Sequence, residues 1–143
     1  MQIGQLLRRK GRDVVTIDGS ESVRGALAML AQHRIGALVV SADGQRIDGI
    51  LSERDIALGL HERGAGLLGD PVSAVMTAEV HTCAPTVGVQ DLARMMTDRR
   101  IRHVPIVEDD ALIGIVSIGD VVKARLDELE DERRQLVDYI QTA

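Results

Sequence analysis

The chain has 143 residues, a hydrophobic content of 45% and a formal net charge of −5. That length is typical of one compact domain. The acidic balance excludes a nucleic-acid binder that works by neutralising backbone phosphates. One Tyr with no Phe or Trp likewise excludes a base-stacking surface. No uninterrupted apolar stretch approaches the roughly 20 residues of a membrane helix, so membrane insertion is not expected.

The cysteine content and the N-terminus indicate the compartment. A single cysteine, Cys83, rules out an internal disulfide and fits a reducing environment. The basic cluster Arg8-Arg9-Lys10 is not followed by the apolar run of a signal peptide. A cytoplasmic protein is therefore expected.

The first half predicts the order strand, helix, strand, strand, helix. Residues 1–13 form a lead-in with one amphipathic helical turn, which Gly11 ends. A strand is predicted over 14–17, and a helix capped by Ser20 or Ser22 runs to His33. Strands over 38–40 and 47–51 turn at Asp43-Gly44, a hairpin signal. Ser52 opens a helix that runs through Leu60.

The second half predicts the same order after a glycine-rich connector. The connector covers 64–71, and a strand follows near 80–83. A helix is predicted over 87–99, and hairpin strands over 104–107 and 112–116 turn at Glu108-Asp109-Asp110. The last helix begins after Ser117 and continues to about Ile140, much further than its counterpart.

The two halves are internal repeats of each other. Val23 pairs with Val89, and Ile35 pairs with Ile101, at one offset. After one residue is lost in the hairpin turn, Asp55 pairs with Asp120. Each copy spans about 60 residues, which is too small for comfortable stability alone, so the copies are expected to pack together.

The repeat predicts an α/β (α+β) fold. Two βαββα units form a pair related by a pseudo-two-fold axis, followed by an extended C-terminal helix. We assign residues 1–62 to the first repeat with its lead-in, 63–71 to the connector, 72–126 to the second repeat and 127–143 to the helical extension.

The C-terminal extension has a heptad-like seam with two interpretations. Its apolar positions follow alternating steps of four and three residues, with Arg133 at one polar position, and are Val122, Leu126, Leu129, Leu136 and Ile140. The helix either lies on its own core or packs against a second copy. Fewer than three clean heptads leave both interpretations open.

A serine and an acid three residues apart open a helix in both copies. Ser52-x-x-Asp55 and Ser117-x-x-Asp120 each follow a Gly-apolar-apolar strand. Either tetrapeptide is a capping box that needs no ligand. A carboxylate is also the natural acceptor for the two hydroxyls of a ribose. The two roles do not exclude each other, although capping is favoured for either tetrapeptide taken alone.

Basic residues recur just before the second strand of each copy. Arg34 and Arg100 stand at matching positions, Arg102 and His103 follow in the second copy, and Arg54 lies in the first helix opening. Arginine at a helix end also favours the helix dipole without any ligand. Guanidinium groups and helix N-termini together are the usual cradle for phosphate. Acids for ribose beside arginines for phosphate describe a nucleotide site.

The chain resembles a pair of CBS domains, the regulatory module named after cystathionine beta-synthase. The resemblance covers about residues 14–126. It rests on the Gly-apolar-apolar-Ser-x-x-Asp motif in both copies, on Ile101-Arg102-His103-Val104-Pro105 and on Val75-Met76-Thr77. It implies two symmetry-related clefts that bind AMP, ADP, ATP, S-adenosylmethionine or NAD(H). It also implies a homodimer.

The resemblance assigns roles to individual residues. Asp55 and Asp120 would hold ribose, with Ser52 and Ser117 beside them. Phosphate would be reached by Arg34, Arg54, Arg100, Arg102 and His103. The adenine pocket would be lined by Thr16, Thr82, Ala37, Val104, Pro105, Ile50 and Ile115.

The two copies differ in ways that make the clefts unequal. Gly36-Ala37 stands where the second copy has Arg102-His103, and Gly119 stands where the first has Arg54. The sequence does not say which cleft is filled. The expected function is a sensor that binds an adenine nucleotide and signals to a separate partner. The alternative is a structural scaffold that docks through its C-terminal helix. No metal site, catalytic cofactor or enzymatic activity is expected, because no ligand spacing or nucleophile motif emerges.

Overall fold

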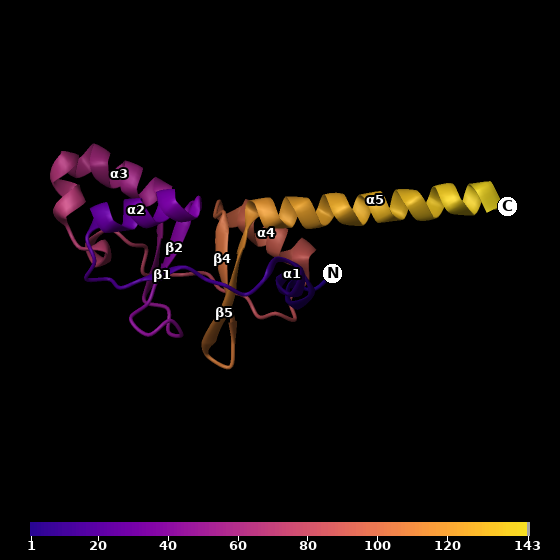
Figure 1. The fold of residues 1–143 in the computed structure, drawn as a ribbon, viewed down its shortest axis with the longest axis horizontal. Helices are drawn as coiled ribbons and strands as arrows, with labels where there is room; N and C mark the ends of the chain where they lie inside the picture. Colours follow the sequence, from indigo (N-terminus) through magenta and orange to yellow (C-terminus); the bar gives the residue numbers. More distant parts are fainter. Residues whose placement is uncertain (143) are drawn as a thin grey trace.

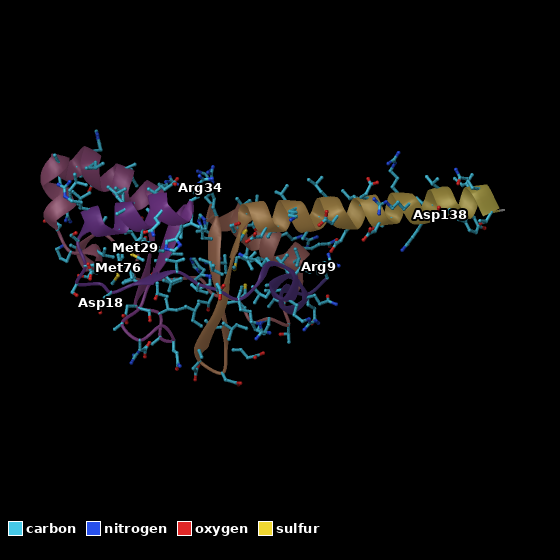
Figure 2. The ribbon with its side chains drawn as sticks, viewed as in Figure 1. Arg9, Asp18, Met29, Arg34, Met76 and Asp138 are labelled. Carbon is cyan, nitrogen blue, oxygen red and sulfur yellow. The ribbon has the colours of Figure 1, made fainter. Side chains whose placement is uncertain are left out.

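The computed structural model describes residues 1–142 and confirms the α/β class, with two repeats and a long C-terminal helix (Figure 1). The two repeats lie next to each other. The last helix, α5 (Ile118–Thr142), leaves the second repeat and projects away from the body of the molecule. Asp138 therefore lies far from the rest of the chain (Figure 2).

The first repeat forms a three-stranded sheet with two helices. β1 (Thr16–Ile17) pairs in parallel with β2 (Ala37–Val40), which pairs antiparallel with β3 (Gly49–Ser52). β2 is buried along its whole length, as expected for a continuous apolar run. The helices are α2 (Val23–His33) and α3 (Glu53–Arg63).

The second repeat is built around a longer hairpin. α4 (Val89–Arg99) precedes β4 (His103–Glu108), which pairs antiparallel with β5 (Ala111–Ser117). Asp109 and Asp110 make the turn with φ of 52° and 61°. Aspartate tolerates this left-handed region better than most residues, which is why the turn forms at the predicted place.

The strand predicted over 80–83 does not form. This segment contributes one isolated parallel bridge, between Cys83 and Ile106. Its two hydrogen bonds run from the Cys83 N–H to the Pro105 carbonyl and from the Val107 N–H to the Cys83 carbonyl. Pro85, two residues after Cys83, has no N–H to extend the ladder, and residues 80–82 lie outside any strand, so the prediction was wrong in extent.

Other boundaries also differ from the sequence prediction, and β1 covers only the last two residues of the predicted strand over 14–17. The strands of the first hairpin are joined by a loop over 41–48. The side chain of Asp43 accepts hydrogen bonds from the N–H groups of Gln45 and Arg46, and these bonds hold the backbone in a turn that keeps residues 45 and 46 out of the strand. α3 runs three residues further, to Arg63. The connector contains a 3-10 helix, η1 (Gly64–Gly69), and a second one, η2 (Val72–Ala74), follows it.

The lead-in is a full helix, α1 (Ile3–Lys10), and it packs on the second repeat. Ile3, Leu6 and Leu7 belong to the core that contains Leu92 and Val116. The connector does the reverse. Leu67 of the connector and Val72 just after it belong to the core of the first repeat, and Met76 packs against that core, as does Met29 (Figure 2). Each repeat is therefore completed by the segment that precedes the other, which ties the two together.

Two matching glycines accept these exchanged segments. A Cβ on Gly49 would lie 2.6 Å from Sδ of Met76 and 2.9 Å from the Thr77 carbonyl oxygen. A Cβ on Gly114 would lie 2.7 Å from Cδ2 of Leu7. The repeated glycine is thus explained by close approach of another segment, in both copies.

Candidate functional site

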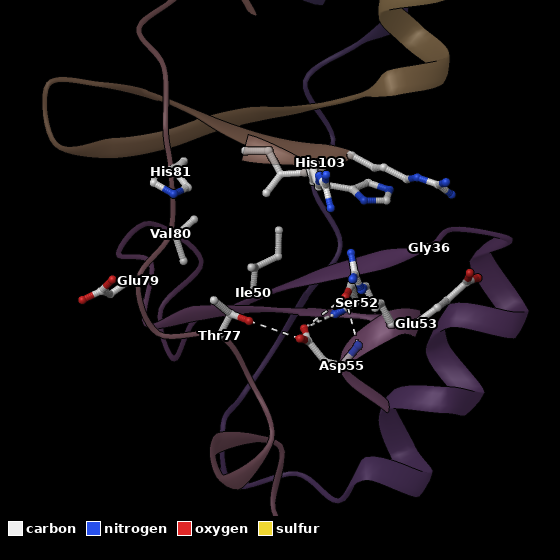
Figure 3. A pocket seen from close by; sticks show the side chains of 14 residues that line it. Gly36, Ile50, Ser52, Glu53, Asp55, Thr77, Glu79, Val80, His81 and His103 are labelled. Atoms are coloured by element: carbon white, nitrogen blue, oxygen red, sulfur yellow. Dashed lines mark hydrogen bonds between the residues drawn. The ribbon is translucent and has the colours of Figure 1, made fainter. Parts of the chain in front are cut away.

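A cavity of about 660 Å³ opens between the two repeats (Figure 3). Its first wall comes from the end of β3 and the start of α3, and carries Ser52, Arg54 and Asp55. Its opposite wall comes from the second repeat and from the segment that leads into it. The residues on that side are Thr77, Glu79, Val80, His81, Arg100, Ile101, Arg102 and His103.

Asp55 is held in place by its own helix opening. Its Oδ2 accepts hydrogen bonds from the Ser52 N–H (2.9 Å) and the Ser52 hydroxyl (3.1 Å), and its own N–H donates to Ser52 Oγ (3.2 Å). The predicted capping box is therefore real. Oδ1 accepts only the hydroxyl of the exposed Thr77, at 3.2 Å. A carboxylate has about four acceptor positions, so Oδ1 has room for a sugar hydroxyl.

Three arginines line the cavity with Asp55. Arg54 follows β3, whereas Arg100 and Arg102 precede β4. None of the ion pairs found among residues 1–142 includes any of the three. Their guanidinium groups are therefore available to a phosphate. Apolar side chains of Ile50, Val80 and Ile101 supply the surface that a flat ring needs.

The repeated arginines also close helices. Arg34 ends α2 with φ 54° and ψ 47°, and Arg100 ends α4 with φ 54° and ψ 42°. Glycine is the usual residue in this left-handed conformation because it has no Cβ. A residue with a side chain destabilises the helix end by about 1–2 kcal/mol there. The helix end alone therefore does not account for arginine at both positions. The presence of an arginine side chain at both helix ends needs another explanation. For Arg100 the cavity offers one, because this residue lines it.

His103 lies where the repeats meet. A Cβ on Gly36 would be 3.2 Å from Cε1 of His103 and 3.7 Å from Cδ of Glu53, so the glycine permits this contact. Partial burial lowers the pKa of the His103 imidazole below its ordinary value of 6.5, and Arg102 and Lys10 add to this effect. Glu53 and Asp120 oppose it. The folded protein therefore holds His103 neutral near pH 7.

We predict a pH dependence of stability from His103. Its folded pKa is lowered, so the unfolded chain binds more protons in mild acid, and stability is lost as the pH falls below about 6.5. Urea unfolding between about pH 7.5 and 5.5 should show a steeper loss for the native chain than for His103→Gln. The exposed His61, changed to Gln, is the control. Parallel curves for the native chain and His103→Gln would refute the assignment.

Seven of the predicted site residues line the cavity together. These are Ile50, Ser52, Arg54, Asp55, Arg100, Arg102 and His103. The other nine do not line it. They are Thr16, Arg34, Ala37, Thr82, Val104, Pro105, Ile115, Ser117 and Asp120, of which Ala37, Val104 and Pro105 are buried in the sheets.

Asp120 has different surroundings from Asp55. It closes the same capping box with Ser117, but its Oδ2 also accepts a hydrogen bond from Lys10 Nζ at 2.6 Å. The ammonium donates a second bond, of 2.7 Å, to the Ile115 carbonyl. Partial burial raises the pKa of Asp120, but Lys10 and the Ser117 N–H outweigh it and hold that pKa below the usual value. The carboxylate is thus ionised and paired.

Some cavity residues are absent from the sequence prediction. They come from the chain between the repeats, at Thr77, Glu79, Val80 and His81, and from the contacts at Gly36, Glu53 and Ile101. The sequence could have indicated Thr77, because it belongs to the motif Val75-Met76-Thr77 on which the family resemblance partly rests. The backbone of Thr77 exchanges two hydrogen bonds with Ile50, each of 2.9 Å, and this bridge brings the segment to Asp55. Only the fold reveals that pairing.

Other chemistry finds little support in the part of the chain that the structure describes. Among residues 1–142 there is no group of three or more His, Cys, Asp or Glu side chains able to hold a metal ion. Burial raises the pKa of the Cys83 thiol, which makes it a poor nucleophile. Within the same residues, no helix is long and apolar enough to cross a membrane.

The sequence model of the CBS domain matches residues 3–62 and 72–127. Together these ranges make up most of the chain, so the protein belongs to the CBS-domain family. A mitochondrial CBS domain-containing protein of Arabidopsis thaliana is 37% identical over 150 aligned residues, which cover 97% of this chain and 71% of the relative. Stand-alone pairs of this kind are generally regulatory rather than catalytic.

Solved structures agree with the fold. The CBS-domain containing protein of Agrobacterium tumefaciens is 45% identical, with a TM-score of 0.84 over 87% of this chain and 99% of that chain. A CBS domain pair solved in complex with 5'-methylthioadenosine and S-adenosyl-L-methionine is 23% identical, with a TM-score of 0.78 over 90% of this chain and 98% of that chain. The second likeness concerns the fold alone.

Proposed function

We propose that this protein is a sensor that binds an adenine nucleotide (AMP, ADP, ATP or NAD(H)) in the cavity at Asp55. Its bound state would be read by a separate partner protein. The complex of a related CBS domain pair with two adenosine-containing ligands supports this class of ligand. The proposal assigns no catalytic step, and it treats the hydrogen-bonded pair Ser52 and Asp55 as the cap of α3 and a binding group for ribose.

One observation carries the proposal. A fixed carboxylate with room at Oδ1 shares the cavity with three guanidinium groups that have no acidic partner among residues 1–142. A ribose phosphate has this charge pattern in reverse, with donating hydroxyls at one end and an anion at the other. In the bound state Asp55 would accept the ribose hydroxyls, Arg54, Arg100 and Arg102 would pair with phosphate, and Ile50 with Ile101 would contact the base.

The position of the cavity supplies a mechanism for sensing. Asp55 belongs to the first repeat, whereas Arg100 and Arg102 belong to the second. A ligand that contacts both walls binds more tightly to one relative arrangement of the repeats than to others. It therefore shifts the population toward that arrangement, by no more than its difference in affinity.

The test is a ligand screen on the full chain. At about 100 times its dissociation constant a ligand adds about 2.7 kcal/mol, which raises Tm by roughly 5–10 °C in a protein of this size. AMP, ADP, ATP, NADH and S-adenosylmethionine are added singly, with inorganic phosphate and guanosine monophosphate as controls. An adenine-dependent rise supports the sensor. No rise with any adenine ligand would refute it and favour the scaffold hypothesis.

We also propose that two copies associate through α5 in a reducing cytoplasm. Leu126, Leu129, Leu136 and Ile140 are 62%, 45%, 64% and 71% exposed. The apolar surface continues into a groove of about 470 Å³ between α4 and α5, lined by Val122 and Leu126. A seam of this spacing is self-complementary, so a second copy is the natural occupant. The compartment rests on the lone Cys83.

A further inference from the structure

The two capping acids, Asp55 and Asp120, are equivalent in sequence, but different side chains donate hydrogen bonds to them. At Asp55 the neighbour is the neutral hydroxyl of Thr77, at 3.2 Å. At Asp120 the neighbour is the ammonium of Lys10, at 2.6 Å. Thr77 and Lys10 lie in comparable parts of the two repeats, because each is at the end of a segment that packs on the other repeat, although the repeat offset pairs Lys10 with Met76. The pseudo-symmetry of the fold thus places a cation on one side only.

The structure holds Lys10 firmly at this place. It is the last residue of α1, whose residues Ile3 and Leu7 are fully buried in the second core. The start of α1 is fixed by hydrogen bonds of 2.9 Å from the Ile3 N–H to the Val87 carbonyl and 2.8 Å from the Gly4 N–H to the Pro85 carbonyl. Leu7 packs against Gly114 of β5. The lysine needs to order only its own side chain to reach Asp120.

The ammonium occupies one of the two carboxylate oxygens of Asp120 and places a positive charge beside the other. Lys10 Nζ binds Asp120 Oδ2 and the Ile115 carbonyl together. The two side chains are only 28% and 25% exposed, so water screens the pair weakly. A neutral hydroxyl that displaced the ammonium would exchange a charged hydrogen bond for a weaker one and leave Lys10 without its partner.

The geometry points to Lys10 as an internal plug: it closes the cleft at Asp120, so that each chain takes up one adenine nucleotide, at Asp55. This inference rests on the proposed function and adds to it the number of sites and the residue that sets that number. Removing the charge of Lys10 uncovers the second ribose site, at Ser117 and Asp120. The roles predicted for those two residues then apply to the unplugged protein.

Calorimetry of the full chain with AMP tests the plug. The native protein should bind one AMP per chain, and Lys10→Met should bind two. Asp120→Ala added to Lys10→Met should return the number to one. Arg9→Met removes a positive charge one residue earlier on the exposed face of α1, and it should leave the number at one. Thermal melts check that each variant is folded.

The outcomes separate this inference from the proposed function. If the native chain binds no AMP or other adenine nucleotide, the proposed function fails. If it binds two per chain, the sensor stands and the plug is refuted. If folded Lys10→Met still binds one AMP per chain, the plug is refuted and the Lys10–Asp120 ion pair has only a structural role. Should that variant not fold, the backbone NMR spectrum of the native chain decides. AMP should shift the amide signals of Asp55 and Arg102 and leave those of Ser117 and Asp120 in place.

Discussion

Replacing Asp55 with alanine is expected to weaken AMP binding by about 100-fold. The carboxylate would accept two sugar hydroxyls, and hydrogen bonds to a charged group contribute about 1.5–3 kcal/mol each. The lower end of that range for both bonds corresponds to a factor of about 100 in the dissociation constant. Calorimetry of the native chain and the variant, with AMP as titrant, measures the change.

The internal repeat supplies a matched control for the loss of the helix cap. Asp55→Ala also removes the acceptor of the Ser52 N–H, which costs about 1 kcal/mol of stability without any ligand. Asp120→Ala removes the same cap from α5, where the Ser117 N–H donates to Asp120 at 2.9 Å. Both variants should lower Tm, but only Asp55→Ala should lower affinity. Equal affinity in the native chain and Asp55→Ala would remove the ribose role of Asp55.

The second large effect is expected at the exposed seam of α5. Changing Leu129 and Leu136 to Glu should convert a dimer to a monomer. Four leucines per dimer would lose burial worth about 1.5 kcal/mol or more each, so the dissociation constant should rise by about 10⁴-fold. Light scattering coupled to gel filtration measures the mass across a range of concentrations.

A variant beside the seam isolates the effect of position from that of charge. Gln135 is one residue before Leu136 and lies off the heptad seam, so Gln135→Glu adds a negative charge without removing an apolar contact. It should remain dimeric, and the monomeric double variant should still be folded and melt cooperatively, because residues 127–142 lie outside both cores. A monomeric native chain at all concentrations would end the dimer proposal and return α5 to a scaffold or docking role.

The sequence was sufficient for the architecture and for part of the site. Repetition at a fixed offset predicted the two βαββα units, and the Ser-x-x-Asp motif predicted both helix openings, because capping depends on residues three apart. The long final helix followed from its heptad spacing and charged flanks. Local patterns failed at 80–83, which forms only one isolated bridge, and at the 41–48 loop, where the turn around Asp43 governs the backbone.

Only the tertiary structure decided which distant segment meets each of the two acids. The sequence placed Lys10 in a lead-in with no known neighbour, since α1 reaches the second repeat by a contact that spans 110 positions between Lys10 and Asp120. The same exchange brings Thr77 to Asp55 and opens a cavity there. Residues close in sequence fix caps and periodicity, whereas the choice of a hydroxyl or an ammonium beside each acid depends on which distant segments the shared core brings together.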